Sequence, residues 1–127
     1  MADEQPTGLM NLVRAAAGAL PFIPRGDHLP TRTLRVDELP IDRAGVAAYC
    51  AVTGLRYGDT VPLTYPFALT FPTVMALITN FDFPFPAMGA VHVENHITRH
   101  RPIAVTDTVS AGVHAQNLRE HRKGLLV

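Results

Sequence analysis

Polar side chains that could bind a metal alternate late in the sequence. His92, Glu94 and His96 are spaced two residues apart, so on a β-strand they would point to one face. Two imidazoles and a carboxylate on one face could bind zinc. The solvated polar face of a half-buried sheet has the same pattern, and His92 alone could instead face a ligand channel. A strand-based metal-binding module is therefore one hypothesis, with an ordinary polar face as its alternative.

Cationic residues gather near the expected ends of the last strands. They are Arg99, Arg101, Arg119, Arg122 and Lys123. Guanidinium groups bind phosphate oxygens through paired hydrogen bonds, and Arg101 is the member that we favour for such a contact. A charged sheet edge that discourages aggregation would have the same composition, and no glycine-rich phosphate loop accompanies these residues.

Aromatic residues alternate with prolines in the middle of the chain. Phe81, Phe83 and Phe85, with Met88 close by, offer rigid apolar area that could line a channel for an apolar ligand. Each proline biases the residue before it away from helix, so the run is expected to be a rigid loop. Simple packing against the core is the alternative.

Neither the thiol of Cys50 nor the hydroxyl of Ser110 is assigned a catalytic role. Cys50, the single cysteine, has no cationic neighbour in its helix, and its apolar surroundings predict burial, which blunts the reactivity of a thiol. Ser110 is the only serine and lacks the glycines of a nucleophile elbow. A serine hydrolase is therefore disfavoured.

The composition is that of one globular domain. The chain has 127 residues, of which 47% are hydrophobic, enough for a core that needs no metal or disulfide. Eleven basic residues balance eleven acidic ones, so no global field attracts nucleic acid or an anionic membrane. The apolar residues 9–23 are interrupted by Arg14 and fall short of the ~20 residues that span a bilayer. We expect a cytoplasmic protein without a membrane anchor.

The first half predicts two helices and one strand. Residues 9–20 have the spacing of an amphipathic helix, and a connector rich in proline and glycine follows up to Pro30. Residues 31–36 suit a short strand. Asp42 is the expected N-cap of a second helix that ends at Gly54.

The middle predicts one buried helix. Residues 60–69 favour extended structure, but Pro62 and Pro66 confine them to a sheet edge. Pro72 suits the first turn of a helix that is apolar on both faces and should therefore be buried. One face of it carries Val74, Leu77, Ile78 and Phe81.

The last third predicts antiparallel strands. Residues 91–101 and 108–116 alternate apolar and polar side chains, and we expect the two strands to pair with each other. Residues 117–124 are turn-like, and residues 125–127 begin a further strand that the C-terminus interrupts. The element order predicts an α+β domain with an antiparallel sheet.

Several short motifs resemble the first half of actinobacterial MaoC-like dehydratases. They are Tyr65-Pro66-Phe67, Phe71-Pro72, Asp82-Phe83-Pro84-Phe85-Pro86, Gly89-Ala90-Val91-His92 and Arg101-Pro102-Ile103. The resemblance covers nearly the whole chain and implies a hotdog fold, in which an antiparallel sheet wraps around a central apolar helix. Residues 1–127 would form a single hotdog domain, with residues 1–30 as an N-terminal helix and connector. Residues 31–127 would form its core, incomplete at the C-terminus.

The resemblance also implies a function. Members of this family are double hotdogs of fatty-acid metabolism that remove water from (3R)-hydroxyacyl thioesters of CoA or acyl carrier protein, without a cofactor. Their catalytic half carries Gly-Asp-x-Asn-Pro-x-His, whose aspartate and histidine divide the acid and base work. Here Gly26-Asp27 continues as His28-Leu29-Pro30, and Gly58-Asp59 continues as Thr60-Val61-Pro62. No catalytic residue is therefore carried over.

For a first half without the catalytic motif, the resemblance leaves a role in binding the acyl thioester. The resemblance implies that this half supplies an acyl-binding channel and a packing surface for the catalytic half, and our candidates to line the channel are Phe81, Phe83, Phe85, Met88 and His92. Arg101 would contact a phosphate, and the partner would be a catalytic hotdog half or a second copy. A stand-alone hotdog thioesterase and the zinc module remain as alternatives, and the sequence leaves open whether the chain alone has activity. An interrupted sheet leaves unpaired backbone groups at its edge, so we also expect self-association or poor solubility.

Overall fold

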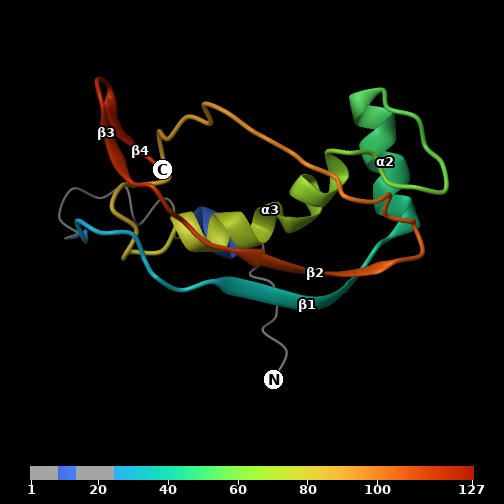
Figure 1. The fold of residues 1–127 in the computed structure, drawn as a ribbon, viewed down its shortest axis with the longest axis horizontal. Coiled ribbons are helices and arrows are strands. Elements are labelled where there is room, and N and C mark those ends of the chain that lie inside the picture. The colour runs from blue at the N-terminus through green and yellow to red at the C-terminus, as the bar shows by residue number, and fades with distance from the viewer. Residues whose placement is uncertain (1–8, 14–24) are drawn as a thin grey trace.

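The computed structural model describes residues 9–13 and 25–127 (Figure 1). Within that part of the chain the elements after residue 25 are β1 (Leu34–Pro40), α2 (Arg43–Thr53), α3 (Tyr65–Ile78), β2 (Thr108–Val113), β3 (Arg119–His121) and β4 (Gly124–Leu126). Residues 9–13 are helical, as expected, and the remainder of the predicted N-terminal helix lies outside the described residues. Among the described residues, no helix has the length and apolar character needed to cross a membrane.

The strands β1 and β2 form an antiparallel ribbon. Leu34 pairs with Val113 at one end and Pro40 with Thr108 at the other. The register shifts after Val36, where Glu38 adopts a positive φ of 52° and forms a bulge. The expected first strand, residues 31–36, therefore begins later and continues further than its local pattern indicated.

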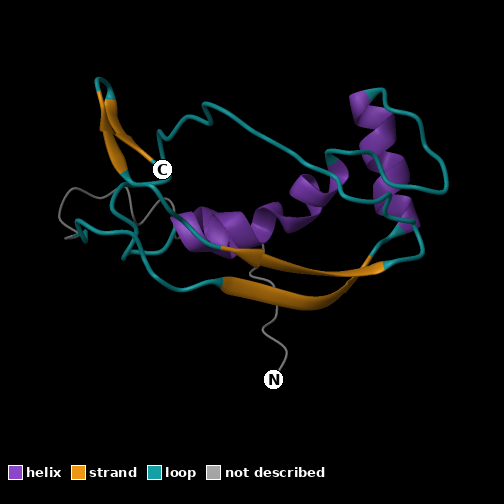
Figure 2. Ribbon diagram, in the orientation of Figure 1, coloured by secondary structure: helices purple, strands orange, loops and turns teal. Residues whose placement is uncertain are grey.

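The predicted partner of β2 is wrong. Residues 91–101 do not form a strand, and β2 pairs with β1 instead. Residues 90–99 are exposed throughout, and Figure 2 shows this stretch as an irregular connection that runs along α3 on the side away from the ribbon. Alternation indicates that a segment can be a strand, but pairing depends on which backbone groups the tertiary fold brings within reach.

The helix α3 starts earlier than predicted. It begins at Tyr65, so the assignment of residues 60–69 to an extended edge is wrong for their second half. Pro66 occupies the first turn, where a missing N–H costs nothing, and Pro72 lies inside the helix. A proline there removes a hydrogen bond and bends the helix, as Figure 1 shows. The Thr70 hydroxyl donates to the Pro66 carbonyl at 2.8 Å, which adds a side-chain bond just before Pro72.

The helix α3 is most deeply buried in its second half. Leu77 and Ala76, which lie on the two faces expected to be buried, are 2% and 4% exposed, whereas Phe71 in the first half is 44% exposed. The helix packs against β1 and β2, as Figure 1 shows, with α2 at one end of the molecule and the β3–β4 hairpin at the other. Residues 117–124, expected to be a turn, contribute β3 and the start of β4 to this hairpin.

The helix α2 is capped as predicted. The Asp42 carboxylate accepts from the backbone N–H groups of Ala44 and Gly45, each at 3.1 Å, and Gly54 ends the helix with φ of 72°. Its inner face joins a buried cluster of Val46, Cys50, Val61, Tyr65 and Val105. Cys50 is thus buried, as its surroundings indicated.

Candidate functional site

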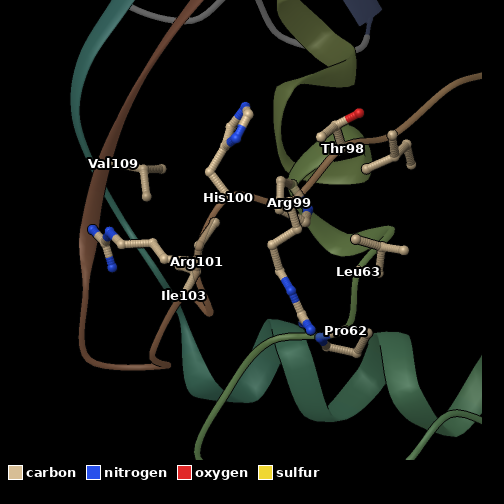
Figure 3. Close-up of a pocket in the computed structure, with 10 residues that line it drawn as sticks. Pro62, Leu63, Thr98, Arg99, His100, Arg101, Ile103 and Val109 are labelled. Atoms are coloured by element: carbon tan, nitrogen blue, oxygen red, sulfur yellow. The ribbon is translucent and has the colours of Figure 1, made fainter.

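A cavity of about 310 Å³ opens where the segment before β2 crosses the start of α3 (Figure 3). Its apolar lining comes from two regions that are far apart in sequence. These residues are Pro62, Leu63, Pro66, Ile97, Ile103 and Val109. The two regions are joined by short antiparallel backbone bonds, in which the Val61 N–H donates to the Ile103 carbonyl at 2.9 Å and the Val105 N–H donates to the Asp59 carbonyl at 2.9 Å. This pairing holds the two halves of the lining together.

Three side chains that can carry positive charge also line this cavity. Arg99, His100 and Arg101 are consecutive, and Figure 3 shows them pointing in different directions. Arg99 extends toward Pro62, whereas Arg101 extends past Ile103 toward the strand that carries Val109. The cavity therefore combines an apolar lining with two separate guanidinium groups.

Asp107 distinguishes the two arginines electrostatically. Its carboxylate lies 3.5 Å from Nη1 of Arg101, which also donates to the Pro102 carbonyl at 3.1 Å. The same carboxylate accepts from the Ala104 N–H at 2.9 Å, so it is fixed by the turn before β2. Across the described ranges, no carboxylate lies within ion-pair distance of Arg99. Arg99 is thus the better placed of the two to meet a ligand anion, because Arg101 already faces a carboxylate.

The predicted cationic group is only partly assembled. Arg99 and Arg101 share the cavity, but Arg119, Arg122 and Lys123 belong to the β3–β4 hairpin at the other end of the molecule (Figure 1). The prediction that the two strand ends lie together is wrong, because residues 91–101 do not pair with β2.

The aromatic loop, residues 81–86, lies at the opposite end of α3 from this cavity. Phe83 is fully buried and contacts Phe85 edge to face, with ring centroids 5.0 Å apart. Phe83 also lines a second cavity of about 230 Å³, together with Leu77 of α3 and Val113 of β2. Phe81 and Met88 are 43% and 49% exposed and line neither cavity. Of the predicted channel residues, only Phe83 lines either of these two cavities.

His92 contacts the first half of α3. Its ring is stacked at a tilt near Phe67, with centroids 5.8 Å apart, and its Nε2 lies 2.8 Å from the Glu94 carbonyl oxygen. His96 Nε2 lies 2.6 Å from a carboxylate oxygen of Glu94. Because the segment is irregular, the three polar side chains do not share a strand face. Within residues 9–13 and 25–127, no three His, Cys, Asp or Glu side chains converge as metal ligands would. The structure therefore gives the zinc hypothesis no support.

The sequence reasoning missed the apolar half of the first cavity. Pro62 was interpreted only as an interruption of a strand, and Leu63 was not considered. Ile103 was noticed within Arg101-Pro102-Ile103, but not as a lining residue. A local pattern gives no signal for these positions, because the cavity exists only where two distant segments meet.

Comparison with known proteins tests the resemblance. No family model matches the chain. The chain is 74% identical, over 123 residues and 97% of its length, to a protein of Mycobacterium tuberculosis named 3-hydroxyacyl-thioester dehydratase X. A crystal structure of HtdX from the same organism matches it with a TM-score of 0.71 at 74% identity, over 74% of this chain. The resemblance to the MaoC-like dehydratase family is thereby confirmed over the length of this chain.

The match extends to only part of those relatives. The chain spans 44% of the length of the dehydratase and 40% of the chain in the crystal structure. A second HtdX structure matches with a TM-score of 0.65 at 74% identity, over 72% of this chain and 38% of that chain. The expected fold class, a hotdog of mixed helix and antiparallel sheet, is confirmed by these matches, and the chain is short relative to the solved family members. The division into residues 1–30 and 31–127 stays a prediction.

Proposed function

We propose that this chain is the acyl-thioester-binding, non-catalytic half of a MaoC-like (3R)-hydroxyacyl-thioester dehydratase. The observation that carries the proposal is the cavity at the start of α3, where an apolar lining adjoins Arg99 and Arg101. An acyl thioester of CoA or acyl carrier protein has matching chemistry, since its phosphopantetheine arm joins a largely apolar chain to phosphate. A volume of about 310 Å³ lies at the lower end of the range of ligand cavities, roughly 300–1,000 Å³.

The proposal assigns different tasks to the parts of the cavity. Leu63, Ile97 and Ile103 cover the methylene groups of the phosphopantetheine arm, which is favourable in proportion to the apolar area removed from solvent. Arg99 binds a phosphate. Arg101 contributes less to phosphate binding, because the Asp107 carboxylate already pairs with it. The acid and base that move protons at the substrate come from a catalytic hotdog half, because the chain lacks the Gly-Asp-x-Asn-Pro-x-His motif.

Titration calorimetry with butyryl-CoA tests the binding. Arg99→Ala is expected to weaken binding at least tenfold, because one charge-assisted hydrogen bond contributes roughly 1.5–3 kcal/mol and 1.4 kcal/mol is a factor of ten. Arg101→Ala should have a smaller effect. Arg56→Ala is the matched control, since Arg56 is exposed and does not line the cavity. Equal affinities for the Arg99 and Arg56 variants would contradict the assignment of this cavity.

Absorbance during hydration of a short trans-2-enoyl-CoA tests the division of labour. The chain alone is expected to be inactive, and addition of a hotdog that carries the missing aspartate and histidine should produce turnover. Turnover by the chain alone would overturn the non-catalytic assignment and favour a stand-alone enzyme.

A further inference from the structure

The aromatic loop is held by a segment that precedes β1. Arg32 forms a two-pronged ion pair with the Asp82 carboxylate, in which Nη2 lies 3.0 Å from Oδ1 and Nη1 contacts Oδ2. Arg25 donates from Nη1 to the Phe83 carbonyl at 3.1 Å. Gly26 lies between these arginines, and a Cβ added there would come within 3.6 Å of the Asp82 carbonyl oxygen. Two arginines and a close backbone approach thus fix one end of the loop.

These contacts lie on both sides of Phe83, which lines a cavity. Phe83 is fully buried, directly follows Asp82, and lines the cavity of about 230 Å³ between α3 and the end of β2. The other apolar lining of that cavity includes Val74, Leu77 and Val113. A displacement of the loop backbone would move the Phe83 ring and change the depth of this cavity.

The geometry makes the Arg32–Asp82 pair stronger than an ordinary surface ion pair. The side chains are 35% and 48% exposed, and a two-pronged guanidinium–carboxylate contact fixes orientation as well as distance. Arg32 also holds the pKa of the Asp82 carboxyl below its usual value, chiefly through the hydrogen bond. The contact joins residues 50 positions apart, so it constrains tertiary structure rather than one turn.

We propose that Arg32 and Asp82 are positioning residues that hold Phe83 in the wall of the cavity beside α3 and so limit the length of acyl chain that this cavity accepts. The inference rests on the proposed function for its ligand, an acyl thioester. It adds a specificity-determining contact that lies away from the arginine-lined cavity.

Hydrogen exchange of the backbone amides of Phe81, Asp82, Phe83 and Phe85 tests the positioning without any ligand. Arg32→Ala and Asp82→Ala are each expected to speed this exchange about fivefold, the factor that corresponds to roughly 1 kcal/mol of a partly exposed pair. The exchanged-charge variant Arg32→Asp with Asp82→Arg should recover much of the protection. Arg35→Ala is the control, because Arg35 pairs with Asp37 within β1 and does not contact the loop.

Calorimetry with butyryl-CoA and decanoyl-CoA tests the specificity in the same variants of the full chain. Loss of either partner is expected to change the ratio of the two affinities at least threefold, and the exchanged-charge variant should move it back toward the original value. Unchanged exchange would overturn the positioning role. Faster exchange with an unchanged ratio would overturn the specificity role. If the unsubstituted chain binds neither thioester, both the proposed function and the specificity role fail, while the exchange data still decide the positioning.

Discussion

At the residue scale, Asp42 organises the junction between β1 and α2. Its carboxylate accepts from two backbone N–H groups at the start of α2, and it is one of two causes that raise the pKa of Tyr65 above its ordinary value. Burial is the larger cause, since a phenolate would lose its hydration there. The phenol of Tyr65 therefore stays protonated at neutral pH, and its ring packs in the buried cluster.

Removal of the cap should measurably destabilise the protein. Asp42→Ala is expected to lower the free energy of unfolding by about 1 kcal/mol, because two helix N–H groups lose their acceptor. Urea unfolding followed by circular dichroism measures the change. Asp42→Asn is the control that keeps an acceptor oxygen, and it should stay within a few tenths of a kcal/mol of the original protein. Equal losses for both variants would mean that the charge, not the hydrogen bonds, stabilises this end of α2.

At the element scale, α3 connects the two cavities. Pro66, near its start, lines the larger cavity, while Leu77, near its end, lines the smaller one. The bend at Pro72 lies between them, and the Pro72 carbonyl accepts from the buried Asn11 side chain at 3.1 Å. The helix therefore fixes the distance between the proposed thioester site and the aromatic loop.

The buried face of α3 should carry most of its contribution to stability. Leu77→Ala is expected to lower the free energy of unfolding by about 3 kcal/mol, within the range for fully buried leucines, because it leaves a cavity against the sheet. Leu55→Ala, at a position 44% exposed, is the matched control and should cost less than about 1 kcal/mol. Chemical unfolding of both variants gives the comparison, and similar losses at the two leucines would contradict the observed packing.

At the scale of the whole molecule, residues 90–99 form a long segment whose apolar side chains are exposed to solvent. Val91 and Val93 are 81% and 71% exposed on residues 90–99, which have the alternation of a strand but no strand partner among the described residues. Extended backbone of this kind can pair with another chain, and exposed apolar side chains add to the attraction. Self-association, expected at first from an interrupted sheet, thus has a specific surface to which it can be assigned.

Sedimentation velocity over a range of concentrations tests that assignment. The sedimentation coefficient is expected to rise with concentration, and Val91→Lys with Val93→Lys should reduce the rise, because buried lysine ammonium groups would oppose pairing. Val52→Lys is the control, since Val52 is 88% exposed on α2 and distant in sequence from the segment. A single monomeric species at every concentration would contradict the expectation.

Features that depend on neighbouring residues could be predicted from the sequence by itself. Asp42 and Gly54 determine where α2 begins and ends, because capping involves backbone groups within one turn. The alternation of β2 and the burial of Cys50 were predicted correctly for the same reason. The resemblance of five short motifs identified the family, which the comparison with the mycobacterial dehydratase confirms.

Features that depend on distant segments were decided only by the tertiary structure. The start of α3 at Tyr65, the pairing of β2 with β1, and the irregular course of residues 90–99 all contradict the local patterns. The cavity likewise forms because the backbone near Val61 pairs with that near Ile103, which brings Leu63 beside Arg99. Residue types specify what each segment can do, but the competition among possible partners for buried surface and hydrogen bonds decides which contacts form.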